Sequence, residues 1–414
     1  MSRARRVGNP FQKFFRFFAS LFQPMTDALR RGELPSFLLT LSAVALFVPY
    51  LGCLPVIFTA GYALFLPHQR KKLLAVSGGR YLFLFFIPLL LLPILYGNLL
   101  GLLAGLGMAV ILIFALFARA NMTPRLFEQI LDLILFCSIL AAVYAVIQTQ
   151  IIILPLHGNR AFSFFFNPNY YGFMLEFFTL LSFYRLIKAK TAARKWWYLF
   201  CLGANVLGLA LCNSLGAILA TFGGALVLLF LSKHYRLFLL VLACLLFFLF
   251  MTYVFPTFFP RVQGVGGTTN TRLTIWDTAL MAFLQTPFFG RGLITYLDIH
   301  TQFGGYATFH AHSLYLDTLL NFGFCGTLLL LVYFCKQYFV VVKNFIYRKK
   351  ILLSSLLLGG LACILIHGIV DTVILWPACA ILTTLLLSGV VGLEHYPSPD
   401  RRLTPAEFFA PSQE

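Results

Sequence analysis

The sequence predicts an all-α protein, a bundle of helices that crosses a membrane many times. Its 414 residues are 60% hydrophobic and have a mean hydropathy of +0.88. Only 11% are charged, whereas soluble domains carry about 25%. The apolar residues also form runs close to the roughly 20 residues that a helix needs to cross a bilayer. A soluble globular domain is therefore excluded.

The apolar runs predict twelve transmembrane helices. The first run, 37–67, is too long for one span, and Pro49, Gly52 and Pro55 interrupt it, which predicts a helical hairpin. The other ten predicted spans are 81–96, 99–118, 127–148, 169–187, 196–212, 214–231, 237–256, 313–335, 351–370 and 373–393.

The basic residues predict the orientation of these spans. The net charge is +18, and 27 of the 31 Lys and Arg residues fall on one predicted side. Cytoplasmic loops collect such residues, so we expect a multi-pass protein of the bacterial plasma (inner) membrane with both termini cytoplasmic. The four exceptions are Arg160, Arg261, Arg272 and Arg291. No basic patch with interleaved aromatic residues occurs, so we expect no nucleic-acid partner.

The chain divides into five predicted parts. Residues 1–36 form a basic cytoplasmic tail whose phenylalanines repeat at helical spacing, which fits an interfacial helix or a disordered tail. Transmembrane helices 1–9 occupy 37–256, and helices 10–12 occupy 313–393. Between them, 257–312 is an extracytoplasmic loop that is long enough to predict short helices and a function. Residues 394–414 form a cytoplasmic tail.

Within the long outer loop, a helix is expected over 271–284. Thr271 or Asn270 can cap its start. Arg272 would then lie at the helix N-terminus, where free N–H groups favour an anion, which predicts a phosphate site. The alternative is an exposed arginine that only solubilises the loop. The apolar face expected for this helix consists of Trp276, Ala279, Leu280 and Phe283.

Two histidines, His310 and His312, lie at the mouth of the tenth span. A neutral histidine there suits general-base chemistry, although a polar histidine at the membrane interface would also fit. No nearby Cys or acidic ligand completes a standard metal site, so we expect no metal and no cofactor. Asp317 or Asp371 could orient a catalytic histidine, or could serve helix pairing.

Several motifs in order resemble the bacterial O-antigen ligase and O-antigen polymerase family over residues 160–330. The motifs are Arg160 with Phe162 and Asn167-Pro168-Asn169, Arg272-x3-Trp276, Pro287-x2-Gly290-x-Gly292, His312-Ser313-Leu314-Tyr315-Leu316 and Gly323-x2-Gly326.

The resemblance implies an inverting, metal-independent membrane glycosyltransferase of the cell envelope. Its donor would be an undecaprenyl-diphosphate-linked glycan, and its acceptor a glycan or lipid-linked glycan, at the outer face of the membrane. Arg272 would bind the diphosphate and His312 would activate the acceptor hydroxyl, with His310, Asp317 and Trp276 as supporting residues. Membrane lipids would be further partners.

Two positions depart from the family pattern. Leu215 occupies a position where the family usually has an arginine, so Arg160 or Arg291 would have to bind diphosphate in its place. Ser313 follows His312, where the family usually has asparagine.

The sequence also fits other functions. The motifs fit a polymerase and a ligase equally. A lipid or solute transporter or flippase is the alternative, although such proteins place their sites near the midplane and often contain internal repeats. Here the polar residues gather at one face and no repeat is evident. A scaffold without chemistry would leave the outer arginines and histidines unexplained.

Overall fold

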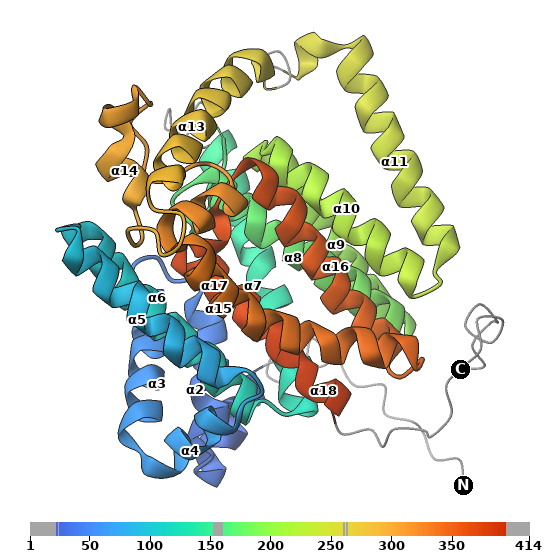
Figure 1. The fold of residues 1–414 in the computed structure, drawn as a ribbon. Coiled ribbons are helices and arrows are strands. Elements are labelled where there is room, and N and C mark those ends of the chain that lie inside the picture. The colour runs from blue at the N-terminus through green and yellow to red at the C-terminus, as the bar shows by residue number, and fades with distance from the viewer. Residues whose placement is uncertain (1–21, 24, 152–159, 260, 262–263, 395–414) are drawn as a thin grey trace, which may run out of the picture.

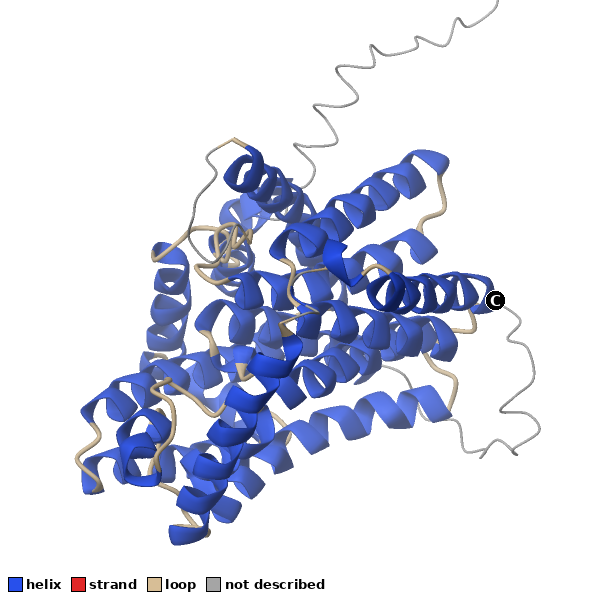
Figure 2. Cartoon of the chain, turned by 90° about the horizontal axis from the view of Figure 1, so that it is seen from above, coloured by secondary structure: helices blue, strands red, loops and turns tan. Residues whose placement is uncertain are grey.

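The computed structural model describes residues 22–23, 25–151, 160–259, 261 and 264–394. Every regular element in these ranges is a helix, and they contain no strand (Figures 1 and 2), so the predicted all-α class is confirmed. The predicted interfacial helix and the C-terminal tail fall largely outside the described residues. The longer helices are α2 (Leu34–Ala45), α3 (Leu54–Phe65), α4 (Pro67–Ala75), α5 (Gly79–Leu95), α6 (Leu99–Asn121), α7 (Pro124–Gln150), α8 (Pro168–Lys188), α9 (Ala192–Cys212), α10 (Leu215–Leu231), α11 (Tyr235–Val254), α13 (Val265–Gln285), α15 (Leu314–Ile346), α16 (Ile351–Val370) and α17 (Pro377–Leu387).

Seven helices in the described part of the chain are long and apolar enough to cross a membrane. They are α6, α7, α9, α11, α15, α16 and the stretch Pro377–Glu394. A bent pair, Leu51–Phe65 with Pro67–Ala75, would add one more if it forms a single broken span. The helices α2, α5 and α10 are apolar but shorter. Multiple membrane spans are therefore confirmed, while the count of twelve stays a prediction.

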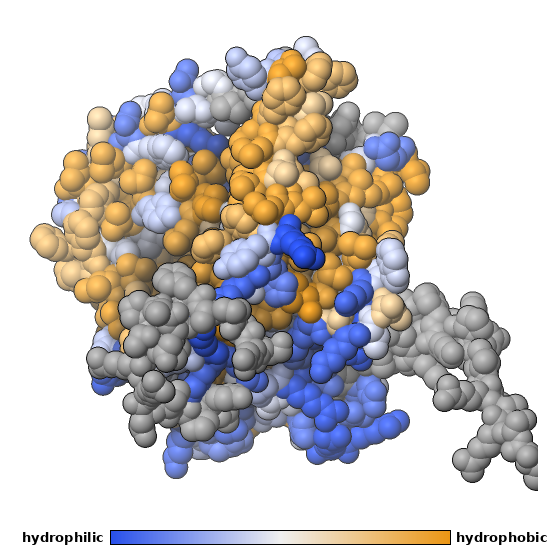
Figure 3. All heavy atoms as spheres, turned by 90° about the vertical axis from the view of Figure 1, so that its right-hand side faces the viewer, coloured by the Kyte–Doolittle hydropathy of each residue, from blue (hydrophilic) through white to orange (hydrophobic). Residues whose placement is uncertain are grey.

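The outer surface fits a bilayer environment. Figure 3 shows hydrophobic side chains over most of the middle of one face, with hydrophilic side chains gathered toward its lower edge. The helix α11 contributes strongly, because only 11% of its most apolar window is buried inside the protein. An apolar belt of this kind would be unfavourable in water and is stable against lipid.

The predicted hairpin in 37–67 is present as α2 and α3. Its bend includes the short 3-10 helix Leu51–Cys53. A Cβ at Gly52 would lie only 2.4 Å from the carbonyl oxygen of Ala45 at the end of α2. The bend therefore requires glycine at this position, which explains why the apolar run breaks there.

A cluster of charges joins α7, α8 and α9 at the end predicted to be cytoplasmic. Arg185 bonds to both Glu128 and Asp132, with its Nε donating to Asp132 Oδ1 at 2.7 Å. Tyr198 also donates to Asp132 at 2.8 Å, and Tyr184 donates to Glu128 at 2.6 Å. These half-buried acids thus serve helix pairing, since each carboxylate is matched by donors from a neighbouring helix.

The helix of the long outer loop begins earlier than predicted. α13 starts at Val265 rather than near Thr271, so the placement of Arg272 at a helix N-terminus is wrong. The glycines at 264, 266 and 267 suggested a loose segment, but glycine in a helix costs only about 1 kcal/mol each relative to alanine. The apolar face also differs, because Leu280 is 45% exposed whereas Ile275 and Ala282 are buried beside Ala279 and Phe283.

α15 is kinked at Gly323, and the turn 287–292 docks into the kink. Gly323 has φ +60° and ψ −170°, which interrupts the helical ladder. The freed N–H groups of Phe324 and Cys325 donate to the carbonyls of Pro287 and Phe288 at 2.8 and 2.9 Å. The outer loop is thereby fixed to the bundle by backbone hydrogen bonds rather than left loose.

Candidate active site

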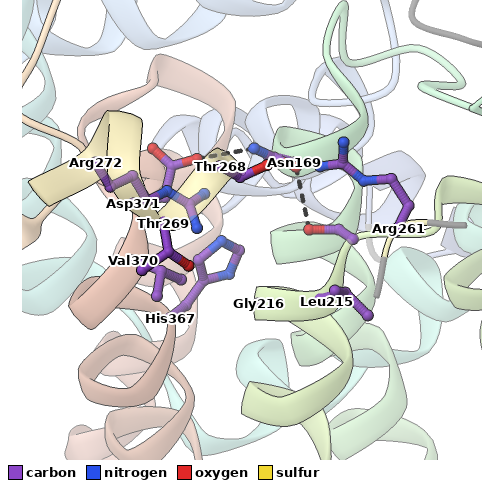
Figure 4. A pocket seen from close by; sticks show the side chains of 11 residues that line it. Asn169, Leu215, Gly216, Arg261, Thr268, Thr269, Arg272, His367, Val370 and Asp371 are labelled. Carbon is purple, nitrogen blue, oxygen red and sulfur yellow. Dashed lines mark hydrogen bonds between the residues drawn. The ribbon is translucent and has the colours of Figure 1, made fainter. Parts of the chain in front are cut away.

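Four helices meet at one end of the bundle and enclose a polar pocket. α8 and α10 begin at this end, α16 ends there, and α13 runs across them (Figure 1). We call this cavity, of about 60 Å³, the Asp371 pocket; Figure 4 labels the residues around it. A second cavity of about 400 Å³, the His312 pocket, is lined by Gly267, Thr268, Thr271, Arg272, Ile275 and His312. Thr268 and Arg272 line both cavities, so the two adjoin.

Asp371, directly after α16, is the central hydrogen-bond acceptor of the Asp371 pocket. Its side chain is buried, and Oδ2 accepts a hydrogen bond from Asn169 Nδ2 at 2.8 Å. Oδ1 accepts from the backbone N–H of Thr372 at 2.8 Å and lies 3.2 Å from Nδ1 of His312. Burial by itself would raise the pKa of this carboxyl, but the His312 hydrogen bond and the charge of His310 outweigh it and hold the pKa below its usual range. Asp371 is therefore an acceptor for His312.

His312 is held in one orientation from three sides. Nδ1 faces Asp371, while Nε2 lies 3.3 Å from the hydroxyl of Thr308. Trp276 donates its indole N–H to the His312 carbonyl at 3.3 Å, and the His312 backbone adopts a left-handed φ of +48°. A carboxylate at Nδ1 favours the tautomer with its proton there, which leaves Nε2 without a proton and able to accept one, either from the Thr308 hydroxyl or from a substrate. This geometry is suited to a general base.

His310 lies against the ring of His312, with 4.4 Å between ring centroids. Burial lowers the pKa of His310 despite the opposing charges of Asp371 and Asp317. Potential ligand atoms of His310, His312 and Asp371 all lie within 4.8 Å of one another, a spacing that could hold a metal ion. The sequence argument against a metal site assumed that no acidic ligand lies near the two histidines. The position of Asp371 contradicts that assumption.

Asp317 supports the loop rather than the base. Its Oδ1 accepts from the backbone N–H of Ala311 at 2.8 Å, and Oδ2 accepts from Asn321 at 3.0 Å. The first bond fixes the residue between the two histidines to the start of α15. Of the two acids that could have oriented a histidine, the structure pairs Asp371 with His312 and uses Asp317 to anchor the adjacent backbone.

Arg272 faces both cavities from the middle of α13. Burial lowers the pKa of its guanidinium, while Asp371 raises it and Arg261 lowers it further. Arg261 lines the Asp371 pocket as well. The anion-binding argument therefore no longer rests on a helix N-terminus. It rests on two like charges that face one small cavity, an arrangement that an anion would stabilise.

Arg160 is placed behind the pocket. Its Nε donates to the Cys212 carbonyl at 2.9 Å, and its Nη2 donates to Asn169 Oδ1 at 2.9 Å. Burial, together with the charge of Arg261, lowers its pKa to about 10. Arg160 lines neither cavity, so it acts on the pocket by orienting Asn169, whose amide then donates to Asp371.

Arg291 lies elsewhere. It donates to Gln285 Oε1 at 2.9 Å, and its guanidinium carbon lies 5.3 Å from the centroid of the Tyr96 ring. It lines neither the Asp371 pocket nor the His312 pocket. The geometry therefore does not bring Arg291 together with Arg272 and His312.

Some site residues carried little signal in the sequence. Asn169 was visible only as part of a turn motif, and Ser214 only as the residue before Leu215. Ser214 Oγ donates to Asn169 Oδ1 at 3.1 Å, which completes the network around that amide. The pairing of His367 with Glu176 was also missed, although an acid and a histidine inside apolar runs were the available signal.

These features define a polytopic helical membrane protein with an arginine-lined pocket and a histidine–aspartate pair at one end of the bundle. Residues 174–331 match the family described as O-antigen ligase. The resemblance to the O-antigen ligase and polymerase family is thereby confirmed over this part of the chain, which includes Arg272 and His312. This match supports, in general terms, O-antigen ligase- or polymerase-type glycan transfer in polysaccharide biosynthesis. No curated protein matches the chain.

Proposed function

We propose that this protein transfers a glycan from undecaprenyl diphosphate to an acceptor hydroxyl at the outer face of the bacterial plasma membrane, as a polymerase or a ligase. The observation that carries the proposal is the shared wall of the two cavities. Arg272 lines both, with the buried Asp371 on one side and His312 on the other. A donor and an acceptor could thus meet next to one guanidinium.

The proposed reaction has one chemical step. His312 Nε2 takes the proton of the acceptor hydroxyl as its oxygen attacks the anomeric carbon of the donor sugar. The bond from that carbon to the diphosphate oxygen breaks, and its electron pair leaves with the diphosphate. Arg272 and Arg261 stabilise the charge that develops on this leaving group, while Asp371 stabilises the imidazolium of His312. Attack opposite the leaving group inverts the anomeric centre.

The proposed placement in the membrane follows the charge pattern. Twelve spans with both termini in the cytoplasm put the two cavities at the outer surface. A lipid-linked donor would then reach them laterally from the bilayer, because Asn169 and Asp371 lie at ends of bundle helices rather than near the midplane. A transporter or flippase would more often bind its substrate near the midplane.

Deletion of the gene in its host, followed by analysis of lipid-linked and surface glycans, tests the proposal. Long lipid-linked chains that are not transferred would indicate a ligase, and single repeat units would indicate a polymerase. Complementation with His312→Ala should fail, and His234→Ala serves as the control because His234 lies between α10 and α11, outside both cavities. Unchanged glycans after deletion would overturn the proposal.

Chelation tests the metal-independent mechanism. Activity of the purified protein should survive strong chelation if His310 and His312 do not ligate a metal. Their spacing with Asp371 makes this measurement necessary. Complete loss of activity, restored by one added divalent ion, would replace the general-base mechanism with a metal mechanism.

A further inference from the structure

A buried histidine–glutamate pair forms part of the Asp371 pocket. Glu176 of α8 is fully buried, and His367 of α16 is 1% exposed. His367 Nδ1 bonds to Glu176 Oε1. The other carboxylate oxygen, Oε2, has no hydrogen-bond partner among the described residues. Neither side chain takes part in the mechanism proposed above.

The second ring nitrogen of His367 is directed toward the pocket. His367 is one of the pocket's lining residues. A Cβ at Gly216, at the start of α10, would lie 3.4 Å from Nε2. Figure 4 shows the imidazole below the side chains of Arg272 and Asp371 and beside Gly216. Nε2 therefore faces the cavity while Nδ1 is occupied.

The buried pair fixes what Nε2 offers to that cavity. Burial strongly disfavours a net charge, so the pair is electrically neutral overall. A neutral form with the proton on Glu176 Oε2 would leave a buried O–H with no acceptor among the described residues, so two neutral forms are favoured. In the ionic form, both ring nitrogens of the imidazolium carry protons. In the other form, the protonated Glu176 donates to Nδ1, and the imidazole proton resides on Nε2. In both forms Nε2–H is a hydrogen-bond donor aimed at the cavity.

The surroundings of Nε2 suit an anionic oxygen. Arg261 and Arg272 line the same pocket, so its lining carries two positive charges. The side chain of Leu215 on the α10 side contributes no donor. The carboxylate of Asp371 is already matched by Asn169, Thr372 and His312, which reduces its repulsion of an anion.

We propose that His367, held by Glu176, is a further donor-binding residue of this site, and that its Nε2–H donates to a phosphate oxygen of the lipid diphosphate. The assignment rests on the proposed function, because it presumes that a diphosphate occupies the Asp371 pocket. The diphosphate would then be bound by the two arginines and also by an N–H donor from α16, so that it is held from more than one side.

The test measures binding of farnesyl diphosphate to the full-length protein in lipid nanodiscs. The double variant E176L/H367F replaces both polar side chains with apolar side chains of similar volume. Proteins commonly tolerate such a replacement of a buried ion pair. We expect its affinity for farnesyl diphosphate to fall about 10- to 100-fold, the range for loss of a charged hydrogen bond. In the transfer assay, KM for the donor should rise more than kcat falls. H234F is the matched control.

A second variant keeps the test informative if E176L/H367F does not fold. Gly216→Ala leaves the Glu176–His367 pair intact but puts a methyl group 3.4 Å from Nε2 and 3.0 Å from Val370 Cγ2. It should also weaken binding of farnesyl diphosphate. Gly107→Ala is its control, because a Cβ at Gly107 meets nothing within 4 Å.

The outcomes separate this proposal from the proposed function. If the wild-type protein binds farnesyl diphosphate and a folded E176L/H367F or G216A variant binds it equally well, the pair is structural only and the assignment of His367 is overturned, while the proposed function stands. If the wild-type protein does not bind farnesyl diphosphate at all, both the assignment and the diphosphate donor are overturned.

Discussion

Arg272 and His312 line one cavity from different elements, α13 and the segment before α15. Their chemistry predicts different defects. The guanidinium can bind two phosphate oxygens at once, whereas a lysine ammonium acts as a point charge. The imidazole instead faces the acceptor. The roles of Arg272 and His312 can therefore be distinguished by measuring donor binding and turnover independently.

Arg272→Lys should lower both donor affinity and turnover, because the charge is kept but the planar fork is lost. His312→Ala should spare donor affinity and lower the rate by about 100- to 10,000-fold, the usual effect of removing a general base. Binding and single-turnover transfer with the purified protein measure both. Arg194→Lys, an exposed position at the start of α9, is the control. Near-normal transfer by His312→Ala would rule out its role and make His310 the next candidate.

Asp371→Asn tests the partner of His312. The substitution keeps the size of the side chain but removes the charge that stabilises an imidazolium, so turnover should fall at least about 100-fold. Binding of diphosphate should be unchanged or tighter, because a negative charge leaves a pocket that receives an anion. Equal turnover of the variant and the wild-type protein would show that His312 works without this carboxylate.

Helix breaks and turns, rather than a separate domain, fix the position of the outer loop. The kink of α15 leaves two backbone N–H groups without an acceptor in the helix. Carbonyl oxygens of the turn 287–292 accept hydrogen bonds from them. Gly292 N–H in turn donates to the Asn321 carbonyl at 2.8 Å. Asn321 also bonds to Asp317, which fixes the backbone beside the histidines. The kink is thus linked to the active site through a few hydrogen bonds.

Gly323→Ala should destabilise the protein and reduce transfer. A Cβ there would lie 2.4 Å from the backbone of Phe288 and Phe289, and φ +60° with ψ −170° is a conformation that only glycine adopts readily. Thermal unfolding of the detergent-solubilised protein measures the effect. Gly107→Ala, in open space on α6, should be neutral or slightly stabilising. Unchanged stability of Gly323→Ala would contradict the docking of the turn 287–292 against Gly323.

For the whole molecule, the predicted orientation can be tested by cysteine labelling in intact cells. In a background that lacks the native cysteines, Gly267→Cys should react with a membrane-impermeant reagent, and Lys190→Cys and Lys349→Cys should not. We expect this labelling pattern because the side of a membrane protein that carries most Lys and Arg residues is retained in the cytoplasm. Gly158, a further position predicted to be outside, lies beyond the described residues. Labelling at 190 together with none at 267 would reverse the topology.

The apolar runs and the charge pattern, taken from the sequence alone, predicted the helical class and the membrane environment. The ordered motifs carried the resemblance to the family, and together with the charge pattern they singled out Arg272 and His312. Hydropathy and charge can be summed along a chain without knowing which helices touch, so these properties are local. The start of α13 was misplaced because glycine preferences suggest a loop, and preferences of about 1 kcal/mol are easily outweighed by the structure around them.

Only the tertiary structure decided which residues meet. His312 and Asp371 are 59 residues apart, and Glu176 and His367 are 191 apart. Whether two such side chains touch depends on how their helices are rotated and packed, and periodicity within one helix does not specify that. The same packing moved Arg291 away from the pocket and placed Arg160 behind Asn169. It also decided that Asp371, rather than Asp317, pairs with His312.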